Sequence, residues 1–167
     1  MMKRIVDRNN RALREQAVEV EKPLFGTRKL AKIITDMQEA LGNEDDGVAL
    51  AAPQIGLSLR IFVVSPRTYG KNDKSRPLVF INPRLIKRSK RERLVDEGCL
   101  SIRWLYGEVR RSENATVEAY DEKGRRFTRG GGGVLAQIFQ HEIDHLEGIL
   151  FTDKAKNIRD IPPPPVA

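Results

Sequence analysis

The feature that most constrains this chain is a pair of histidines four residues apart, His141 and His145, with Glu142 directly after the first. They are the only two histidines in the 167-residue sequence. On a helix this spacing places both imidazoles on one face, one turn apart, where they can hold one cation. The fold must therefore present this helix face to a metal site, and Glu142 can take a proton from a water that the cation activates.

A third metal ligand is needed, because catalytic sites usually have three protein ligands and one position for water. Cys99, the single cysteine, is the candidate, since its segment is predicted to lie against the helix. A thiolate with two imidazoles suits iron(II), zinc, nickel or cobalt. A lone cysteine is more often a small buried apolar residue. Cys99 could also be the nucleophile of a thiol hydrolase, but then Glu142 and one histidine have no role.

The apolar pattern predicts two helices and several short strands. One helix begins after Thr27, a potential N-cap, and ends before Gly42. The other spans about residues 134–147 and is closed by Gly148. The four glycines 130–133 are predicted to interrupt the strand pattern before it. The predicted strands are residues 61–64, 78–81, 109–111, 115–120 and 125–128, with an arm at 1–26 containing at most one helical turn, a polar loop at 67–76 and an extended segment at 85–94.

The length fits one domain, which we place at residues 1–157, followed by a proline-rich tail at 158–167 that is extended or disordered. The single cysteine excludes an intramolecular disulfide. No secretory-type segment follows Met1, and the apolar runs are too short to span a bilayer. These features predict a cytoplasmic protein with no membrane partner.

The net charge of +7 is concentrated in one segment. Residues 67–93 contain ten Lys or Arg and two Asp or Glu, which is +8 and leaves −1 for the rest of the chain. Such a segment is more often a solvated face, but it can also bind a polyanion. We therefore carry the hypothesis that residues 67–93 contact a polyanion, and we expect a monomer with no DNA partner.

Three short motifs, taken together, resemble those of the peptide deformylase family. Residues 47–54 read Gly-Val-Ala-Leu-Ala-Ala-Pro-Gln, residues 97–101 read Glu-Gly-Cys-Leu-Ser, and residues 140–145 read Gln-His-Glu-Ile-Asp-His. They occur in the family's order, and the resemblance covers roughly residues 4–157. It implies an α+β fold of a single domain, with antiparallel strands wrapped around a central helix that carries the HExxH motif.

The resemblance also implies a role for each motif residue. Cys99, His141 and His145 would hold a metal, typically Fe²⁺, with Glu142 as general base and later proton donor. Gln54, through its side-chain amide, and Leu100, through its backbone N–H, would donate to the oxyanion that forms from the formyl group. The reaction would release formate from N-formylmethionyl nascent peptides. With such substrates, the polyanion that residues 67–93 contact would be ribosomal RNA.

The family's substrate pairs as an added strand with backbone near the first two motifs, and its methionine enters an apolar pocket. The residues that the resemblance assigns to substrate binding are Gly47, Val48, Ala49, Leu50, Gly98, Val134 and Ile138, the pocket also touching His141. Ordinary core packing could equally explain the aliphatic members of this set.

The sequence departs from the family's pattern at a few positions. Ala49 replaces the second glycine usual in the first motif, Arg103 and Trp104 replace a common Pro-Gly, and Gln137 stands where relatives carry Arg or Ile. Two other functions remain as alternatives: a small HExxH peptidase, and a metal-binding or ribosome-docking module with little activity. Gln54 and residues 97–101 have no part in a typical zinc peptidase, and an intact Glu142 argues against the module.

Overall fold

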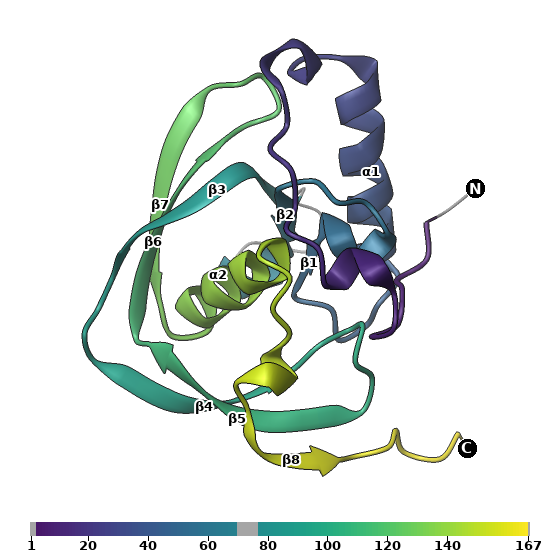
Figure 1. Ribbon diagram of the computed structural model, residues 1–167, viewed down its shortest axis with the longest axis vertical. Helices are drawn as coiled ribbons and strands as arrows, with labels where there is room; N and C mark the ends of the chain where they lie inside the picture. The colour runs from purple at the N-terminus through teal and green to yellow at the C-terminus, as the bar shows by residue number, and fades with distance from the viewer. Residues whose placement is uncertain (1–2, 70–76, 167) are drawn as a thin grey trace.

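Two antiparallel sheets surround a central helix in the computed structural model, which describes residues 3–69 and 77–166. The central helix is α2 (Gly133–Leu146), and it carries the HExxH motif. Figure 1 shows strands curving past α2 on several sides, while α1 (Arg28–Gly42) lies outside this enclosure. The predicted α+β fold with strands around the motif helix is confirmed.

The larger sheet has the strand order β1-β2-β3-β6-β7, and the smaller has the order β4-β5-β8. The larger contains β1 (Ala49–Ala51), β2 (Ile61–Val64), β3 (Leu78–Arg88), β6 (Asn114–Tyr120) and β7 (Arg126–Gly132). The smaller contains β4 (Glu92–Gly98), β5 (Leu105–Ser112) and β8 (Lys156–Asp160). Both β1 and β4 are therefore edge strands, each with one side of its backbone left free by its own sheet.

Helix α1 forms where the apolar periodicity predicts it. The Thr27 hydroxyl accepts a hydrogen bond from the backbone N–H of Leu30 at 3.2 Å, which satisfies one of the free donors of the first turn. Gly42 is the last helical residue rather than the first beyond it, and Asn43 is the C-cap. The buried face of α1 packs on β1 and β2, so it supports the strand that lies within the first motif.

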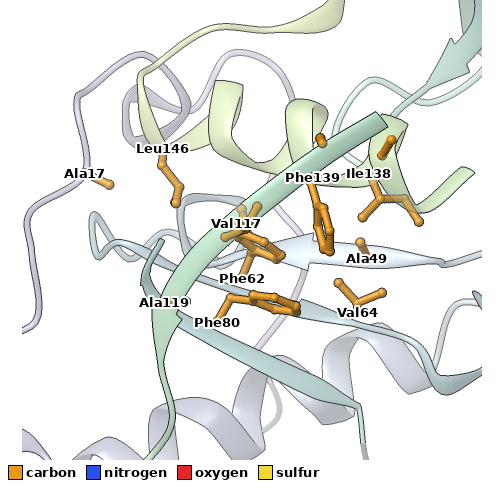
Figure 2. Packing of buried hydrophobic residues seen from close by; sticks show 13 residues of the cluster. Ala17, Ala49, Phe62, Val64, Phe80, Val117, Ala119, Ile138, Phe139 and Leu146 are labelled. Atoms are coloured by element: carbon orange, nitrogen blue, oxygen red, sulfur yellow. The ribbon is translucent and has the colours of Figure 1, made fainter. Parts of the chain in front are cut away.

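The core between α2 and the larger sheet is built around three phenylalanines (Figure 2). Phe62 of β2 and Phe80 of β3 stack with ring centroids 4.5 Å apart, and Phe139 of α2 meets Phe80 edge-on at 5.4 Å. All three are fully buried. Burial of one such side chain contributes about 1.5–3 kcal/mol, so this contact fixes the position of α2 against the strands.

The prediction that glycines 130–133 interrupt the strand pattern is wrong. Gly130, Gly131 and Gly132 continue β7 and pair with β6, and only Gly133 begins the helix. A Cβ on Gly131 would lie 2.7 Å from the side chain of Leu135. Glycine is needed here because the first turn of α2 lies directly on the strand that precedes it.

Several segments extend further than the sequence pattern indicates. Strands β3 and β5 are longer than predicted, and the extended segment 85–94 is divided by a turn between β3 and β4. The N-terminal arm has two short 3-10 turns instead of at most one. All the 3-10 turns of the described chain are Arg11–Leu13, Lys22–Leu24, Ala52–Ile55, Pro66–Tyr69 and Phe151–Asp153.

The C-terminal end differs from the predicted tail because β8 pairs with β5 through Asp160. The predicted domain boundary at residue 157 thus falls inside a strand. Residues 70–76 of the predicted polar loop lie outside the described residues. No helix in the described part of the chain offers an apolar stretch long enough to cross a membrane.

Candidate active site

A cavity of about 270 Å³ lies between β1, β4 and α2. The edge strands of both sheets contribute to its lining, through Val48 and Ala49 at the start of β1 and through Asp96 to Gly98 of β4. Ten of the predicted site residues line it: Val48, Ala49, Gln54, Gly98, Cys99, Leu100, Val134, Ile138, His141 and Glu142. The three sequence motifs therefore meet in one place.

The three candidate metal ligands form a cluster at the base of this cavity. One ligand atom from each of Cys99, His141 and His145 lies within 4.8 Å of the other two. The Cys99 Sγ is 3.3 Å from His145 Nε2. The two histidines are buried one turn apart on α2, and Cys99 reaches them from the residue directly after β4.

These donors fit a divalent transition metal. One thiolate and two imidazoles make a three-ligand set that leaves a position open for water or substrate. The Nδ1 of His141 is 2.8 Å from a carboxylate oxygen of Glu97, which leaves Nε2 to face the cluster. A carboxylate behind a histidine in this way fixes its ring and tautomer at metal centres.

Glu142 lies beside the cluster with one carboxylate oxygen unpartnered. Its Oε2 is buried and has no hydrogen-bond partner among the described residues. Burial raises the pKa of Glu142 to about 7 in the polypeptide alone, with a further contribution from the charge of Glu97. Buried polar atoms rarely stay unpaired, so this oxygen is free to bind a water or substrate proton in the cavity.

Gln54 points its side-chain amide toward the same region. Its carbonyl oxygen accepts a hydrogen bond from the backbone N–H of Ala51 at 2.9 Å, which orients the amide. The Nε2 then lies 3.5 Å from the Cys99 sulfur and 3.3 Å from the Ser101 hydroxyl. The backbone N–H of Leu100 makes no backbone hydrogen bond within the described chain. The Gln54 amide therefore donates within the site, to Cys99 and Ser101, and the Leu100 N–H follows Cys99 directly in the chain.

A buried ion-pair network supports the metal ligands from behind, and sequence analysis did not predict it. Arg111 of β5 binds both carboxylate oxygens of Glu97, at 3.0 and 2.6 Å, and a third nitrogen binds Asp144 of α2 at 2.7 Å. Lys154 also binds Asp144, at 3.0 Å. The chain of contacts therefore runs from His141 through Glu97 and Arg111 back to the motif helix.

The network sets the charges around the histidines. Burial opposes ionisation of Glu97, but the hydrogen bonds from His141 and Arg111 outweigh it and lower the pKa of the carboxyl to about 2. Burial lowers the pKa of His145 well below its ordinary value. Burial acts in the same direction on His141, but the nearby Cys99 sulfur and the Glu97 carboxylate raise its pKa well above the usual range. An ionised Glu97 is thus held against His141.

Two of the predicted substrate-binding residues lie outside the cavity lining. The Leu50 side chain is fully buried in the core beneath α1, and Gly47 packs against Leu41 and Glu44. His145 also lies behind the lining. The cavity adds residues that the motifs did not indicate as site residues: Asp46, Asp96, Glu97, Arg103, Trp104, Leu105, Tyr106 and Gln137.

Comparison with known proteins identifies the peptide deformylase family. The model of the family described as polypeptide deformylase matches residues 2–160. A peptide deformylase of Desulfitobacterium hafniense is 43% identical over 152 residues, covering 91% of this chain and 93% of that protein. A peptide deformylase of Thermomicrobium roseum is 41% identical over 155 residues, covering 92% of this chain and 85% of the relative.

Solved structures agree with these relatives. The crystal structure of peptide deformylase from Thermotoga maritima superposes with a TM-score of 0.82 at 34% identity, covering 93% of this chain and 99% of that one. A peptide deformylase from Synechococcus elongatus, crystallised in complex with actinonin, gives a TM-score of 0.80 at 34% identity, covering 92% of this chain and 78% of that one.

Proposed function

The chain belongs to the polypeptide deformylase family, and from this membership we propose how its own residues carry out the family's reaction. It is a metal-dependent hydrolase that removes the N-terminal formyl group from formylmethionyl peptides. The observation that carries the proposal is that Cys99, His141 and Glu142 line one cavity, with His145 completing the ligand cluster behind its lining. We assign the metal-ligand role to the first three.

The donor set would hold one divalent cation, and we propose iron(II) as the native metal. When bound, the cation supplies a Lewis acid that polarises the formyl carbonyl and makes water acidic enough to attack near neutral pH. The Glu97 carboxylate keeps the His141 ring oriented with Nε2 toward the cluster.

Glu142 is the proposed general base. Its unpartnered Oε2 accepts a proton from the attacking water, and the same oxygen then returns the proton to the amine of the departing methionine. Glu142 can serve in both steps because its Oε2 has no hydrogen-bond partner among the described residues. The products are formate and a peptide with a free N-terminus.

Gln54 and Leu100 are the proposed oxyanion donors. The Gln54 Nε2 and the Leu100 backbone N–H donate hydrogen bonds to the formyl oxygen as it gains negative charge. The Ala51 contact holds the amide in place before the substrate arrives, so little reorganisation is needed during the reaction.

The substrate peptide is proposed to lie as an extra strand between the two sheet edges. Backbone groups near Val48 to Leu50 on one side and Gly98 on the other pair with it, and such pairing does not depend on the substrate's side chains. The methionine side chain enters the apolar part of the cavity, toward Val48, Val134 and Ile138. Many different nascent chains would therefore be accepted.

Two variants separate these roles. Glu142→Ala should keep its metal and lose turnover of formyl-Met-Ala-Ser, because only the base is removed. Cys99→Ala should lose metal, because a ligand is removed. Bound metal is measured by elemental analysis and turnover by formate release. Normal deformylation by the Glu142→Ala protein would exclude Glu142 as the base.

Ribosome contact through residues 67–93 is a further part of the proposal. Within the described part of this segment, exposed basic residues gather around the turn between β3 and β4: Lys87, Arg88, Lys90, Arg91 and Arg93. Clustered cations of this kind bind phosphate backbones, and such binding weakens as salt increases. Residues 70–76 of the segment lie outside the described residues.

Co-sedimentation with ribosomes tests this contact. Replacing Lys87, Arg88 and Lys90 by Glu should abolish binding, whereas the same change at Lys22 and Lys29, exposed on another part of the molecule, should not. Binding that persists unchanged in the first variant, or that does not weaken with salt, would exclude the basic segment as the contact.

We also propose that the protein works in the cytoplasm. We propose a monomer, because every residue that has a role in the site comes from one chain. Sedimentation of the active enzyme should give a mass near 18.9 kDa. None of residues 162–166 lines the cavity, so removal of the chain after Ile161 should leave deformylation unchanged.

A further inference from the structure

Arg103 connects two loops that border the substrate cavity. Its guanidinium lies 2.8 Å from the Asp46 carboxylate and 2.5 Å from the Glu44 carboxylate. The two acids belong to the loop between α1 and β1, whereas Arg103 belongs to the loop between β4 and β5. We call this set of three residues the Arg103 bridge. Asp46 and Arg103 both line the cavity, so the bridge lies at its rim.

Trp104, the next residue, has an unusual backbone conformation. Its φ is 66°, in the left-handed region that bulky side chains rarely adopt. Such a conformation persists only where surrounding contacts hold it. Here the guanidinium carbon of Arg103 lies 5.1 Å from the centroid of the Trp104 ring, and the Trp104 carbonyl accepts a hydrogen bond from Ile161. The ring lines the cavity mouth beside Arg103.

The bridge joins the two backbone edges between which a substrate strand would lie. Asp46 is three residues before β1, and Arg103 is five residues after the end of β4. These strands belong to different sheets, so no strand pairing fixes the distance between their free edges. A two-carboxylate contact to one guanidinium resists both separation and sliding of the loops, because the fork of Arg has fixed geometry.

We propose that Arg103 is a positioning residue that sets the width of the substrate groove and holds Trp104 at its mouth. The inference rests on the proposed function, because the groove it concerns is the one assigned to the formylmethionyl peptide. Arg103 acts on peptide binding through the loops and touches none of the reacting groups. Its loss should therefore raise KM and leave kcat unchanged.

The test compares Arg103→Ala with Arg103→Lys and with a control. Arg14→Ala removes a similar Arg–carboxylate contact, to Asp153, away from the cavity. For formyl-Met-Ala-Ser, Arg103→Ala should raise KM by about fivefold with kcat unchanged, the size expected for a partly exposed pair. Arg103→Lys should give a smaller rise, because it keeps the charge but loses the fork. Arg14→Ala should match the wild type.

A double-mutant cycle tests whether the effect passes through the bridge. Asp46→Asn should reproduce part of the rise in KM, and adding it to Arg103→Ala should cause little further change. Full additivity of the two substitutions would overturn the proposal, as would an unchanged KM or a loss confined to kcat.

A binding measurement separates this inference from the proposed function. Trp104 is the only tryptophan of the chain, so its fluorescence reports on the groove without turnover. In a Glu142→Ala background, formyl-Met-Ala-Ser should change the Trp104 emission, and Arg103→Ala should raise the fitted Kd by the same factor as KM. If the wild type releases no formate but Arg103→Ala still raises the Kd, the proposed function is wrong and the role of Arg103 in the groove stands. If the wild type is active and neither KM nor Kd changes, the inference fails alone.

Discussion

Removing Arg111 should destabilise the protein far more than removing an ordinary surface arginine. The side chains of Arg111 and Glu97 are each only 4% exposed, and that of Asp144 is 14% exposed. In Arg111→Ala both carboxylates stay buried without their shared partner. Glu97 keeps its contact to His141 and Asp144 its contact to Lys154, but each loses the forked guanidinium. Breaking a buried ion pair from one side costs about 3–5 kcal/mol. For a chain of this size that corresponds to a fall in Tm of about 6–20 °C.

Urea unfolding of the metal-free protein measures this cost directly. A chelator is included so that metal binding does not add to the free energy of unfolding. Arg111→Lys should lie between the wild type and Arg111→Ala, because it keeps a charge but cannot bind Glu97 through two parallel hydrogen bonds. Arg84→Ala, which removes an exposed pair with Glu19, is the matched control and should cost at most about 1 kcal/mol.

The reasoning is refuted if Arg111→Ala loses no more than Arg84→Ala at an unchanged urea m-value. That result would mean that the contacts that remain, from His141 to Glu97 and from Lys154 to Asp144, are enough to stabilise the two carboxylates. The network would then be dispensable for stability, and its role behind His141 would have to be tested by metal affinity alone.

Three further results are expected. Gln54→Leu should lower kcat by about 10²–10³ with metal content unchanged, as measured by formate release, because one oxyanion donor is lost. Gly131→Ala should lower the free energy of unfolding in urea by about 1–3 kcal/mol, because its Cβ would lie 2.7 Å from Leu135. Arg14 lowers the pKa of the Asp153 carboxyl. The stability that Asp153 contributes relative to Asp153→Asn should thus be present above the ordinary carboxyl pKa and shrink as pH falls through the lowered one, in thermal unfolding followed against pH.

Each of these expectations has a contradicting outcome. Full activity of Gln54→Leu would show that Gln54 is not an oxyanion donor. Unchanged stability of Gly131→Ala would mean that α2 shifts at no cost. A stability difference for Asp153→Asn that grows on acidification would have the wrong sign for a carboxyl with a lowered pKa.

The cluster of candidate metal ligands could be predicted from sequence because it depends on residue spacing. Two histidines four residues apart lie on one face of a helix, where they can bind the same cation, and α2 places them so. Cys99 could be proposed as the third ligand because its segment was predicted to lie against the motif helix. Helix α1 and strand β2 were predictable for a similar reason, since their apolar residues follow the helical and strand patterns closely.

The ion-pair network and the last strand were not predictable, because neither leaves a local pattern. Arg111 lies in a strand where a charged residue usually faces solvent, and its burial depends on Glu97 and Asp144 arriving from other elements. Strand β8 is exposed along its whole length and forms only because β5 offers it a free edge. The prediction for glycines 130–133 failed for the same reason. Gly131 is needed because of its close contact with Leu135, which the local sequence does not show.

The most direct test of the account is formate release from formyl-Met-Ala-Ser by the full chain, prepared without oxygen and loaded separately with iron(II), nickel and zinc. The account predicts turnover that stops when a chelator removes the metal and returns when iron(II) is added back. No formate from correctly folded protein with any of the three metals would contradict the assignment of the cavity to deformylation.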